Sequence, residues 1–300
     1  MPTMQTRRRF LAAVSLAGAA SLLRPPRASA AEGTLETTSV RIASTGNICL
    51  APLYVSEELL RAEGFIDVQY IETEVTGVAG AIGRGTVYFG VNYAPVAIAA
   101  IDAGESLTVL AGTHIGCMEL FAKEDIGNVA DLKGKSVGVQ DWRSTDHVLV
   151  ALMAAHVGLD PAKDIRWAAD PKVRPIDQFI ERKIDAVLSF PPQPQDLRAR
   201  HVGHVIVDST LDRPWSQYFC CMLAGNREFV QSHPVATKRA VRAILKATDL
   251  CATEPVRVAR QIVDGGFTPR SDYAAQSLSE LPYDGADWRF LEEVKRELKA

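Results

Sequence analysis

Two short stretches of the chain concentrate side chains that can hold an anion. Residues 44–47 (Ser-Thr-Gly-Asn) offer hydroxyl and amide groups, and residues 142–145 (Trp-Arg-Ser-Thr) add a guanidinium and an indole ring. A guanidinium presents a fork of N–H donors that fits a carboxylate or a sulfonate. Backbone N–H groups at the start of a helix also attract anions, and both stretches precede a predicted helix. The residue types and their spacing therefore predict a binding site for a small anionic solute.

The other candidates stand at comparable positions, where a predicted strand ends and a loop or a helix follows. Asn92 and Tyr93 end one strand, His114 lies where the chain leaves its first half, and Phe190 ends a later strand. Ligands of open α/β sheets bind outside the carboxyl ends of the strands. The predicted ligand-binding residues are Thr45, Asn47, Asn92, Tyr93, His114, Trp142, Arg143, Ser144, Thr145 and Phe190.

Several of these residues also have a purely structural interpretation, which the sequence leaves open. Ser144 or Thr145 can cap the following helix without touching a ligand. Trp142 either stacks on the ligand or packs in a core, and Arg143 either binds the ligand or faces solvent. Phe190 lines either the cleft wall or the core, and a structural role at a hinge is favoured for His114.

Strands and helices alternate along most of the chain, which predicts the α/β class with parallel sheets covered on both faces. Strands are predicted at residues 39–43, 67–71, 87–91 and 107–113, with helices at 51–63, 78–83 and 95–103. A second series has strands at 119–122, 136–140, 165–167 and 186–190, a helix at 144–157, a loop at 190–195 and an edge strand at 205–207. Residues 217–223 are predicted to return to the first sheet, and helices follow at 234–252, 255–263, 271–281 and 287–299.

The sequence carries no recognisable catalytic or metal-binding motif. GxSxG and HExxH are absent, and residues 134–136 (Gly-Lys-Ser) lack the preceding glycine of a phosphate-binding loop, because Val129 stands there. His201 and His204 have no obvious third metal ligand. The cysteines form no CxxC pair and are interpreted as small buried hydrophobic residues; they are Cys49, Cys117, Cys220, Cys221 and Cys251. We therefore expect no catalytic residue, no metal and no cofactor.

The first thirty residues have the three regions of a cleavable export signal. Arginines at positions 7–9 precede an apolar stretch at 10–23, and the small residues Ala28 and Ala30 follow. The stretch Thr-Arg-Arg-Arg-Phe-Leu at 6–11 resembles a twin-arginine signal, whose machinery exports folded proteins; the general secretory route stays open as an alternative. The apolar stretch is shorter than the roughly 20 residues of a membrane helix. We predict a signal peptide at 1–30 and a periplasmic protein that is soluble after cleavage.

Removal of residues 1–30 makes the chain distinctly acidic. It takes away five arginines and no acidic residue, which leaves 28 basic and 36 acidic residues and a net charge of −8. An acidic surface repels nucleic acid and anionic lipid, although a cleft can still be locally positive. The predicted partner is a small molecule or a protein, and not nucleic acid.

Five segments resemble, in this order, the substrate-binding proteins of ABC importers. They read IASTGNICLAPLYVSEELLRAEGF, YFGVNYAP, ELFAKEDIGNVADLKGKSVGVQ, VGLDPAKDI and KIDAVLSFPP. The branch that they resemble binds nitrate, sulfonates, taurine and thiamine-pyrimidine precursors. The resemblance implies a two-lobed periplasmic binding protein fold (type II) with two crossing hinge segments and a helical C-terminus. It assigns residues 31–116 to lobe I and 117–210 to lobe II, and residues 211–300 return to lobe I and form the C-terminal helices.

The same resemblance implies the function and the partners. It implies a monomeric solute-binding component of an ABC import system, which binds a small organic anion between its lobes and delivers it to a permease and its ATPase. Enzymes on the same fold are the alternative. A desulfinase-like branch uses a cysteine in the first ligand loop, near Cys49, and a thiamine-pyrimidine-synthase-like enzyme has a cysteine cluster that Cys220 and Cys221 match poorly. A solute sensor that contacts a signalling receptor is a third alternative.

Overall fold

The computed structural model of the chain describes residues 33–74, 77–142, 144–170 and 172–283. Its contacts divide the chain into two units, Met1–Thr34 and Leu35–Ala300, and the architecture below belongs to the second. The predicted signal peptide, Arg143 and the predicted helix at 287–299 lie outside the described residues. No described helix combines the length and the apolar character needed to cross a membrane.

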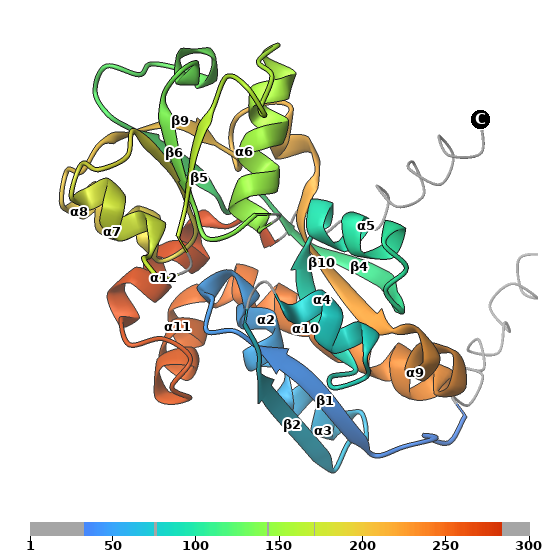
Figure 1. Cartoon of the computed structure of the whole chain (residues 1–300). Helices are drawn as coiled ribbons and strands as arrows, with labels where there is room; N and C mark the ends of the chain where they lie inside the picture. The colour runs from blue at the N-terminus through green and yellow to red at the C-terminus, as the bar shows by residue number, and fades with distance from the viewer. Residues whose placement is uncertain (1–32, 75–76, 143, 171, 284–300) are drawn as a thin grey trace, which may run out of the picture. The chain divides into compact units, whose positions relative to one another are not determined.

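The first sheet contains the four leading strands and one strand from much later in the chain (Figure 1). Its strands are β1 (Ser39–Ser44), β2 (Asp67–Glu72), β3 (Phe89–Tyr93), β4 (Leu107–Ile115) and β10 (Phe219–Asn226), in the order β2-β1-β3-β10-β4. Strands β1, β2 and β3 are parallel, as predicted, but β10 runs antiparallel to both β3 and β4. The expectation of a wholly parallel sheet is therefore wrong here. Strand β10 follows the connection from the second sheet, which contains no crossover helix. A parallel strand would require such a helix, whereas an antiparallel strand does not.

Helices of the first half and of the C-terminal part surround this sheet. They are η1 (Ile48–Leu50), α2 (Ala51–Tyr54), α3 (Glu57–Ala62), α4 (Val78–Gly83), α5 (Ala94–Asp102), α9 (Arg227–Ser232), α10 (Pro234–Thr253), α11 (Pro255–Asp264) and α12 (Ser271–Glu280). The single helix predicted at 51–63 is interrupted between α2 and α3. The Ser56 hydroxyl donates to the Leu53 carbonyl at 2.7 Å, so a side chain competes there with the helical backbone.

The second sheet contains the middle of the chain. Its strands are β5 (Glu119–Ala122), β6 (Ser136–Val139), β7 (Arg166–Ala169), β8 (Ala186–Ser189) and β9 (His204–Asp208), in the order β7-β6-β8-β5-β9. Strand β9 lies at the edge, as predicted, and β5 is antiparallel to both of its neighbours. Its helices are η3 (Val129–Leu132), α6 (Thr145–His156), α7 (Pro175–Ile180) and α8 (Gln193–Ala199). The loop expected at 190–195 ends early, because α8 begins at Gln193 and its first turn tolerates Pro194.

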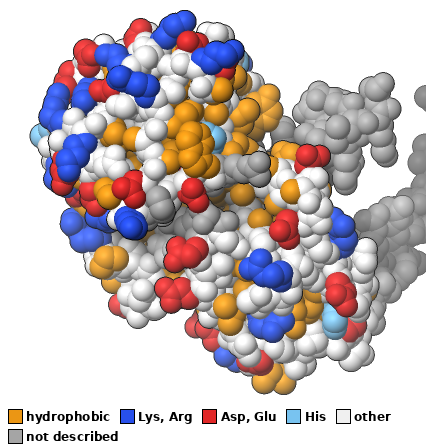
Figure 2. All heavy atoms as spheres, viewed as in Figure 1, with side chains coloured by type: hydrophobic (Ala, Val, Ile, Leu, Met, Phe, Trp, Pro, Cys, Tyr) orange, Lys and Arg blue, Asp and Glu red, His pale blue; other side chains and the backbone are white. Residues whose placement is uncertain are grey.

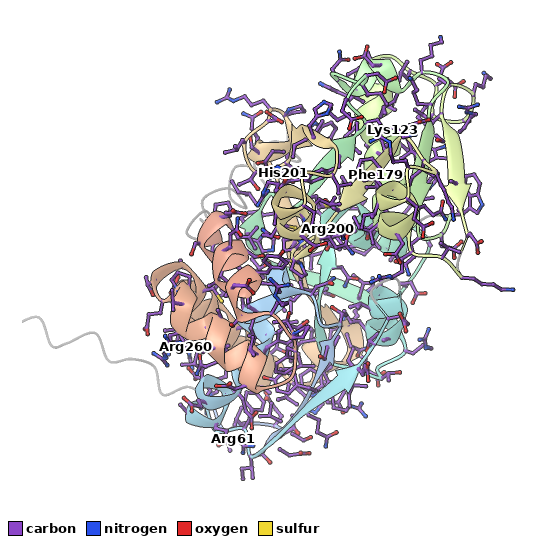
Figure 3. All side chains as sticks on the ribbon, turned by 90° about the vertical axis from the view of Figure 1, so that its left-hand side faces the viewer. Arg61, Lys123, Phe179, Arg200, His201 and Arg260 are labelled. Carbon is purple, nitrogen blue, oxygen red and sulfur yellow. The ribbon has the colours of Figure 1, made fainter. Side chains whose placement is uncertain are left out.

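Each sheet buries its own hydrophobic side chains. Ile42, Phe89 and Leu223 are fully buried in the first. Phe179 packs with Phe121 in the second, and Figure 3 shows it in the part of the molecule that also contains Lys123 and His201. The predicted α/β class is confirmed.

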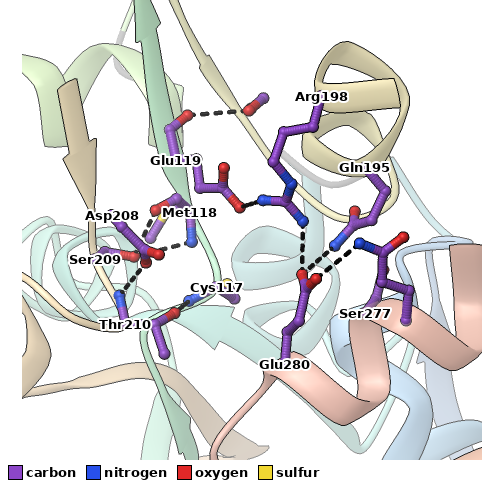
Figure 4. A network of polar contacts seen from close by, with 12 residues as sticks. Cys117, Met118, Glu119, Gln195, Arg198, Asp208, Ser209, Thr210, Ser277 and Glu280 are labelled. Atoms are coloured by element: carbon purple, nitrogen blue, oxygen red, sulfur yellow. Dashed lines mark hydrogen bonds and ion pairs between the residues drawn. The ribbon is translucent and has the colours of Figure 1, made fainter. Parts of the chain in front are cut away.

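Two segments connect the sheets. The first is the short stretch 116–118 between β4 and β5, and the second is 209–218 between β9 and β10, which includes η4 (Trp215–Gln217). They are tied together where the Met118 N–H donates to Ser209 Oγ at 2.9 Å and the Ser209 hydroxyl donates to the Met118 carbonyl at 2.8 Å (Figure 4). The two connections therefore lie side by side at the junction of the sheets.

Glu63 connects α3 to the long helix α10. Its carboxylate accepts from Arg242 Nε at 2.8 Å and contacts Lys246 at 3.3 Å, and the Arg242 contact holds the pKa of Glu63 below its usual value. Replacing Glu63 by glutamine is expected to lower the free energy of unfolding by about 1 kcal/mol at neutral pH. A depressed carboxyl pKa stabilises the fold above the unfolded value of about 4.5, so the loss should fade as the pH falls through the depressed pKa.

Urea unfolding at neutral pH and at about pH 3 measures this dependence. The matched control is Glu57→Gln, which removes an exposed pair with Arg61 on α3 and should change the stability by less than about 0.5 kcal/mol. Equal losses in the two variants would contradict the assigned role of Glu63.

Candidate functional site

Two adjoining hollows lie where the two sheets meet. The larger has a volume of about 150 Å³, and the smaller, about 10 Å³, shares Asn47 and Thr145 with it. The larger is lined by Asn47, Gln140, Ser144, Thr145, Asp146, Arg174, Pro175, Ile176, Val187, Leu188, Phe190 and Gln193. The smaller is lined by Thr45, Asn47, Leu50, Val78, Val91, Asn92, Tyr93, Val96, Thr145 and Cys221. We call the two together the cleft.

Most of the predicted site residues lie in this cleft, at the ends of strands of both sheets or in the segments that follow them. They are Thr45, Asn47, Asn92 and Tyr93 from the first sheet, with Ser144, Thr145 and Phe190 from the second. The rule that ligand sites form outside the carboxyl ends of strands explains why residues so distant in sequence converge here.

The first sheet contributes polar atoms that have no hydrogen-bond partner. Asn92 is 4 % exposed, and its Nδ2 is buried and unpartnered. Thr45 Oγ1 is buried and unpartnered as well, while the Thr45 N–H donates to the Tyr54 hydroxyl at 3.4 Å. Buried polar groups in native proteins nearly always have a partner. These two side chains therefore have unused hydrogen-bonding capacity in the smaller hollow.

Aromatic side chains from both sheets meet at one side of the cleft. The rings of Tyr93 and Phe190 have centroids 5.4 Å apart and are tilted at 42°. Burial raises the pKa of the Tyr93 hydroxyl well above its usual value, so Tyr93 stays neutral. The two rings give the cleft an apolar surface beside its polar atoms.

The N-terminus of α6 forms part of the wall, with Ser144 at the N-cap position. The Ser144 side chain makes no capping hydrogen bond to the helix backbone. Its Oγ lies 2.5 Å from the Asp141 carbonyl oxygen and also contacts the Asp146 carboxylate. Asp146 accepts N–H bonds from Gln140 at 2.7 Å and from His147 at 3.0 Å. Burial raises the pKa of Asp146 in spite of these bonds. The Asp146 carboxylate is therefore already hydrogen-bonded to groups at and just before the start of α6.

Two of the remaining predicted residues, Trp142 and His114, do not line the cleft. Trp142 is 59 % exposed, and its ring packs edge-on against His147, with centroids 5.1 Å apart. The loop before α6 thus places the indole on the surface. His114 is completely buried and lies among cysteines. Nothing is described for Arg143.

Besides Asp146, three polar residues of the cleft were not among the predicted ones. Gln140 follows β6, Arg174 precedes α7 in the connection after β7, and Gln193 begins α8 after β8. Arg174 pairs with Asp177 at 2.8 and 2.9 Å. The same strand-end rule would have found all three, had it been applied to every strand of the second sheet.

Three cysteines, Cys49, Cys117 and Cys221, lie together, with Cys220 beside Cys117, and Cys221 lines the smaller hollow. The interpretation of the cysteines as buried residues is confirmed, but their proximity could not be read from the sequence. A hydrogen bond with Cys117 lowers the pKa of Cys49, yet neighbouring Cys221 and burial raise it overall. Cys49 is 1 % exposed and therefore lacks the accessible, low-pKa thiolate of a nucleophilic cysteine.

A family model described as NMT1/THI5 like matches residues 48–258, which is most of the chain. The chain belongs to this NMT1/THI5-like family. The matched range contains every strand of the two sheets except β1, and every predicted site residue except Thr45 and Asn47.

Curated relatives and solved structures resemble this NMT1/THI5-like chain at moderate distance. "Putative binding protein BAB2_1146" of Brucella abortus (strain 2308) is 28% identical over 177 residues, which cover 58% of this chain and 54% of the relative. The chain thus matches about half the length of that curated relative.

Two solved structures share its fold. The alkanesulfonate-binding protein SsuA from Xanthomonas axonopodis pv. citri, bound to MOPS, has a TM-score of 0.68 and 16% identity, covering 83% of this chain and 86% of that one. The periplasmic nitrate-binding protein NrtA from Synechocystis PCC 6803 has a TM-score of 0.65 and 14% identity, covering 77% of this chain and 67% of that one. The predicted two-lobed binding-protein fold is confirmed.

Proposed function

We propose that this protein is the solute-binding component of an ABC import system, which binds a small organic anion and delivers it to a membrane permease and its ATPase. Membership in the NMT1/THI5-like family and a fold shared with sulfonate- and nitrate-binding proteins support the proposal. The observation that carries it is the cleft, in which a cavity of about 150 Å³ adjoins the smaller hollow that is lined by Thr45 and Asn92 with their unpartnered polar atoms.

The groups around the cleft favour an anion. The N-terminus of α6 presents the positive end of a helix dipole, and Arg174 adds a guanidinium at the rim. Asp146 is the one carboxylate among the described residues that line the cavity, and its own loop occupies it with N–H bonds. A sulfonate, a taurine-like compound, nitrate, an aromatic carboxylate or a thiamine-pyrimidine precursor fits these groups.

Binding should close the cleft. Asn92 and Thr45 lie on the side of the first sheet and Thr145 on the side of the second, and all three line the smaller hollow, so a solute held there contacts residues of both sides. A ligand shifts an equilibrium through its extra contacts with one state. We place lobe I at 31–116, lobe II at 117–210 and the return to lobe I with the C-terminal helices at 211–300, with hinges near residues 115–119 and 211–218.

Binding without turnover is the proposed activity. The enzymatic alternative of a desulfinase-like protein needs a nucleophilic thiolate, whereas the thiol of Cys49 is buried and its pKa is raised. We assign no catalytic residue to the chain.

The proposed location is the periplasm, reached after removal of a twin-arginine signal at 1–30 by the export machinery. We propose a monomer that binds no nucleic acid. Basic and acidic side chains are interspersed over the face shown in Figure 2, so this face has no continuous positive patch for a polyanion.

Thermal unfolding with a panel of solutes tests the proposal. The panel contains nitrate, taurine, an alkanesulfonate, an arylsulfonate, an aromatic carboxylate and a hydroxymethylpyrimidine, with choline as a cationic contrast. A solute at a hundredfold excess over its Kd should stabilise the protein by about 2.7 kcal/mol, which raises the Tm by about 5–10 °C for a chain of this size. Small-angle scattering with the same solute should show a smaller radius of gyration.

Thr145→Val supplies the site control, because it removes one hydroxyl of the cleft and keeps the shape of the side chain. It should reduce the affinity for the stabilising solute by about fivefold to tenfold and leave the Tm without solute nearly unchanged. Stabilisation by choline alone, or an unchanged scattering profile at saturation, would refute the anion-binding cleft.

A further inference from the structure

A compact cluster of metal-binding side chains lies next to the cleft. It consists of Cys49, His114, Cys117 and Cys221, and their donor atoms all lie within 4.8 Å of one another. None of the four is more than 4 % exposed. We call these four residues the Cys3His cluster.

The fold brings these residues together from distant parts of the sequence. His114 on β4 is paired in register with Cys221 on β10, so the two side chains share one face of the sheet. Cys49 arrives on η1 from the first ligand loop, and Cys117 arrives on the first segment that connects the sheets. Each donor therefore belongs to a different segment, and together they surround one point.

The backbone around the cluster is distorted in a way that aims the donors. Cys117 has φ of 102° and follows Gly116 with φ of 65°. For a non-glycine residue such a conformation costs about 1–3 kcal/mol and persists where the surroundings require it. The pairing of β10 with β4 also shifts register on both sides of Cys221, and such irregularities redirect side chains.

His114 has an imidazole nitrogen that lacks a partner. Its Nδ1 lies 3.2 Å from the Ile115 carbonyl oxygen, a contact in which Nδ1–H donates. Nε2 is buried and has no hydrogen-bond partner. Metal-binding histidines usually hold the ring in this way, with one nitrogen bound to a carbonyl and the other to the ion.

We propose that the Cys3His cluster binds a thiophilic divalent cation, for which Zn²⁺ is the best match. Three thiolates and one imidazole are a common donor set of closed tetrahedral zinc sites. In a tetrahedral site, Zn–S bonds of about 2.3 Å place two sulfur atoms about 3.8 Å apart. The donor atoms here lie within 4.8 Å of one another, so side-chain rotations that move each atom by about 1 Å bring all four to bonding distance of one ion. Loading releases one proton from each of the three thiols and changes no oxidation state.

Such an ion would be a resident structural group and not the transported solute. Four protein donors fill a tetrahedral site and leave no open position. The ion would fix the first ligand loop, through Cys49, to both β10 and the first connecting segment. The Tyr283 hydroxyl already donates to the Cys49 carbonyl at 3.1 Å, which holds this loop from the other side.

Cys117 could form a disulfide in place of binding the ion. Cys220 lies beside the cluster, and its sulfur is 3.2 Å from that of Cys117. Oxidation of these two thiols would release two electrons and two protons to an external oxidant, such as a thiol oxidoreductase of the export compartment. A bond between Cys117 and Cys220 would remove Cys117 from the cluster and exclude the proposed site.

The test measures metal in the whole protein, purified under reducing conditions from cells supplied with zinc. Elemental analysis should find one zinc ion per chain. After chelation, addition of Co²⁺ alone should produce the thiolate-to-cobalt charge-transfer bands and the intense d–d bands of a tetrahedral cobalt centre. Cys49→Ala and His114→Ala should each lower the zinc affinity by at least about 100-fold.

Cys251→Ala is the matched control, because Cys251 is equally buried in α10 but lies outside the cluster, and this variant should retain one zinc ion. The metal content and the cobalt spectrum of the unaltered protein decide the question if a cluster variant fails to fold. A protein that takes up neither ion, equal zinc affinity in the His114 variant, or a Cys117–Cys220 disulfide in the exported protein would overturn the inference. A metal-free protein that still binds a solute would overturn this inference and leave the proposed transport function standing.

Discussion

Replacing Asn92 by leucine is expected to weaken solute binding by about 10-fold to 100-fold without destabilising the protein. A lost hydrogen bond to a charged ligand accounts for about 1.5–3 kcal/mol. Asn92 Nδ2 is buried without a partner, so an apolar side chain of similar size removes a desolvation cost. The free energy of unfolding without solute should stay the same or rise by about 1 kcal/mol. Isothermal titration with the stabilising solute and urea unfolding measure the two effects.

Asn226 provides the matched control for this result. It is also a buried asparagine of the first sheet, but its Nδ2 donates to the Ile82 carbonyl at 2.8 Å and its Oδ1 accepts from the Phe229 N–H at 2.9 Å. Asn226→Leu should therefore cost about 2 kcal/mol of stability and leave the affinity for solute unchanged. If Asn92→Leu behaves like Asn226→Leu, then Asn92 supports the fold and the cleft has been assigned wrongly.

Replacing Arg198 by methionine should lower the free energy of unfolding by about 2–3 kcal/mol at neutral pH, because it leaves a buried carboxylate without its partner. Arg198 on α8 contacts Glu119 on β5 and also donates to Glu280 on α12 at 2.7 Å (Figure 4). Glu119 is only 8 % exposed. Since Arg198 itself is one-third exposed, we expect a smaller loss than the roughly 3–5 kcal/mol known for fully buried ion pairs.

The pH dependence of this loss distinguishes a buried carboxylate from lost packing. Burial already raises the pKa of Glu119, and removal of the guanidinium should raise it further. A carboxyl whose folded pKa is raised stabilises the protein below the unfolded value of about 4.5, and this contribution is lost as the pH rises through the folded value. The difference between Arg198→Met and the unaltered protein should therefore be small near pH 4 and grow toward neutral pH.

Arg200→Met is the control for Arg198→Met. Arg200 lies on the same helix, is visible in Figure 3, and pairs with Asp196 at 3.1 Å on the surface. Its loss should change stability by less than about 0.5 kcal/mol at any pH. A loss in Arg198→Met that does not vary with pH would contradict the role assigned to the buried carboxylate of Glu119.

Most of the fold could be predicted from the alternation of apolar strands and helices, because that pattern depends on local residue order. Strands β2 and β5 and helix α4 have the predicted bounds or differ from them by one residue. The direction of β10 could not be predicted, since it depends on how the chain returns from the other sheet. Small departures had local causes that compete with helix propensity, such as the Ser56 hydroxyl between α2 and α3.

The candidate site could be predicted as far as it follows the rule that ligands bind outside the carboxyl ends of strands. Strand ends of parallel segments meet at one edge, which brings Asn92 and Thr145 into one cleft. The rule does not predict the direction of a side chain, so it could not show that Trp142 faces solvent. The Cys3His cluster was invisible in the sequence because its members are spread over more than 170 positions, and only the pairing of β4 with β10 unites them.

Strand β10 lies between β3 and β4, so the first sheet is completed by a segment made long after its neighbours (Figure 1). More than 100 residues, including the whole second sheet, separate the end of β4 at Ile115 from the end of β10 at Asn226. During synthesis on a ribosome, β4 can therefore be linked to β3 only after β10, which lies between them, has been made. Pairings over such separations are slow and expose strand edges in the meantime. A nascent chain that stops before β10 has two unfilled strand edges and depends on chaperones, whereas the second sheet has all of its strands by residue 208 and can fold first.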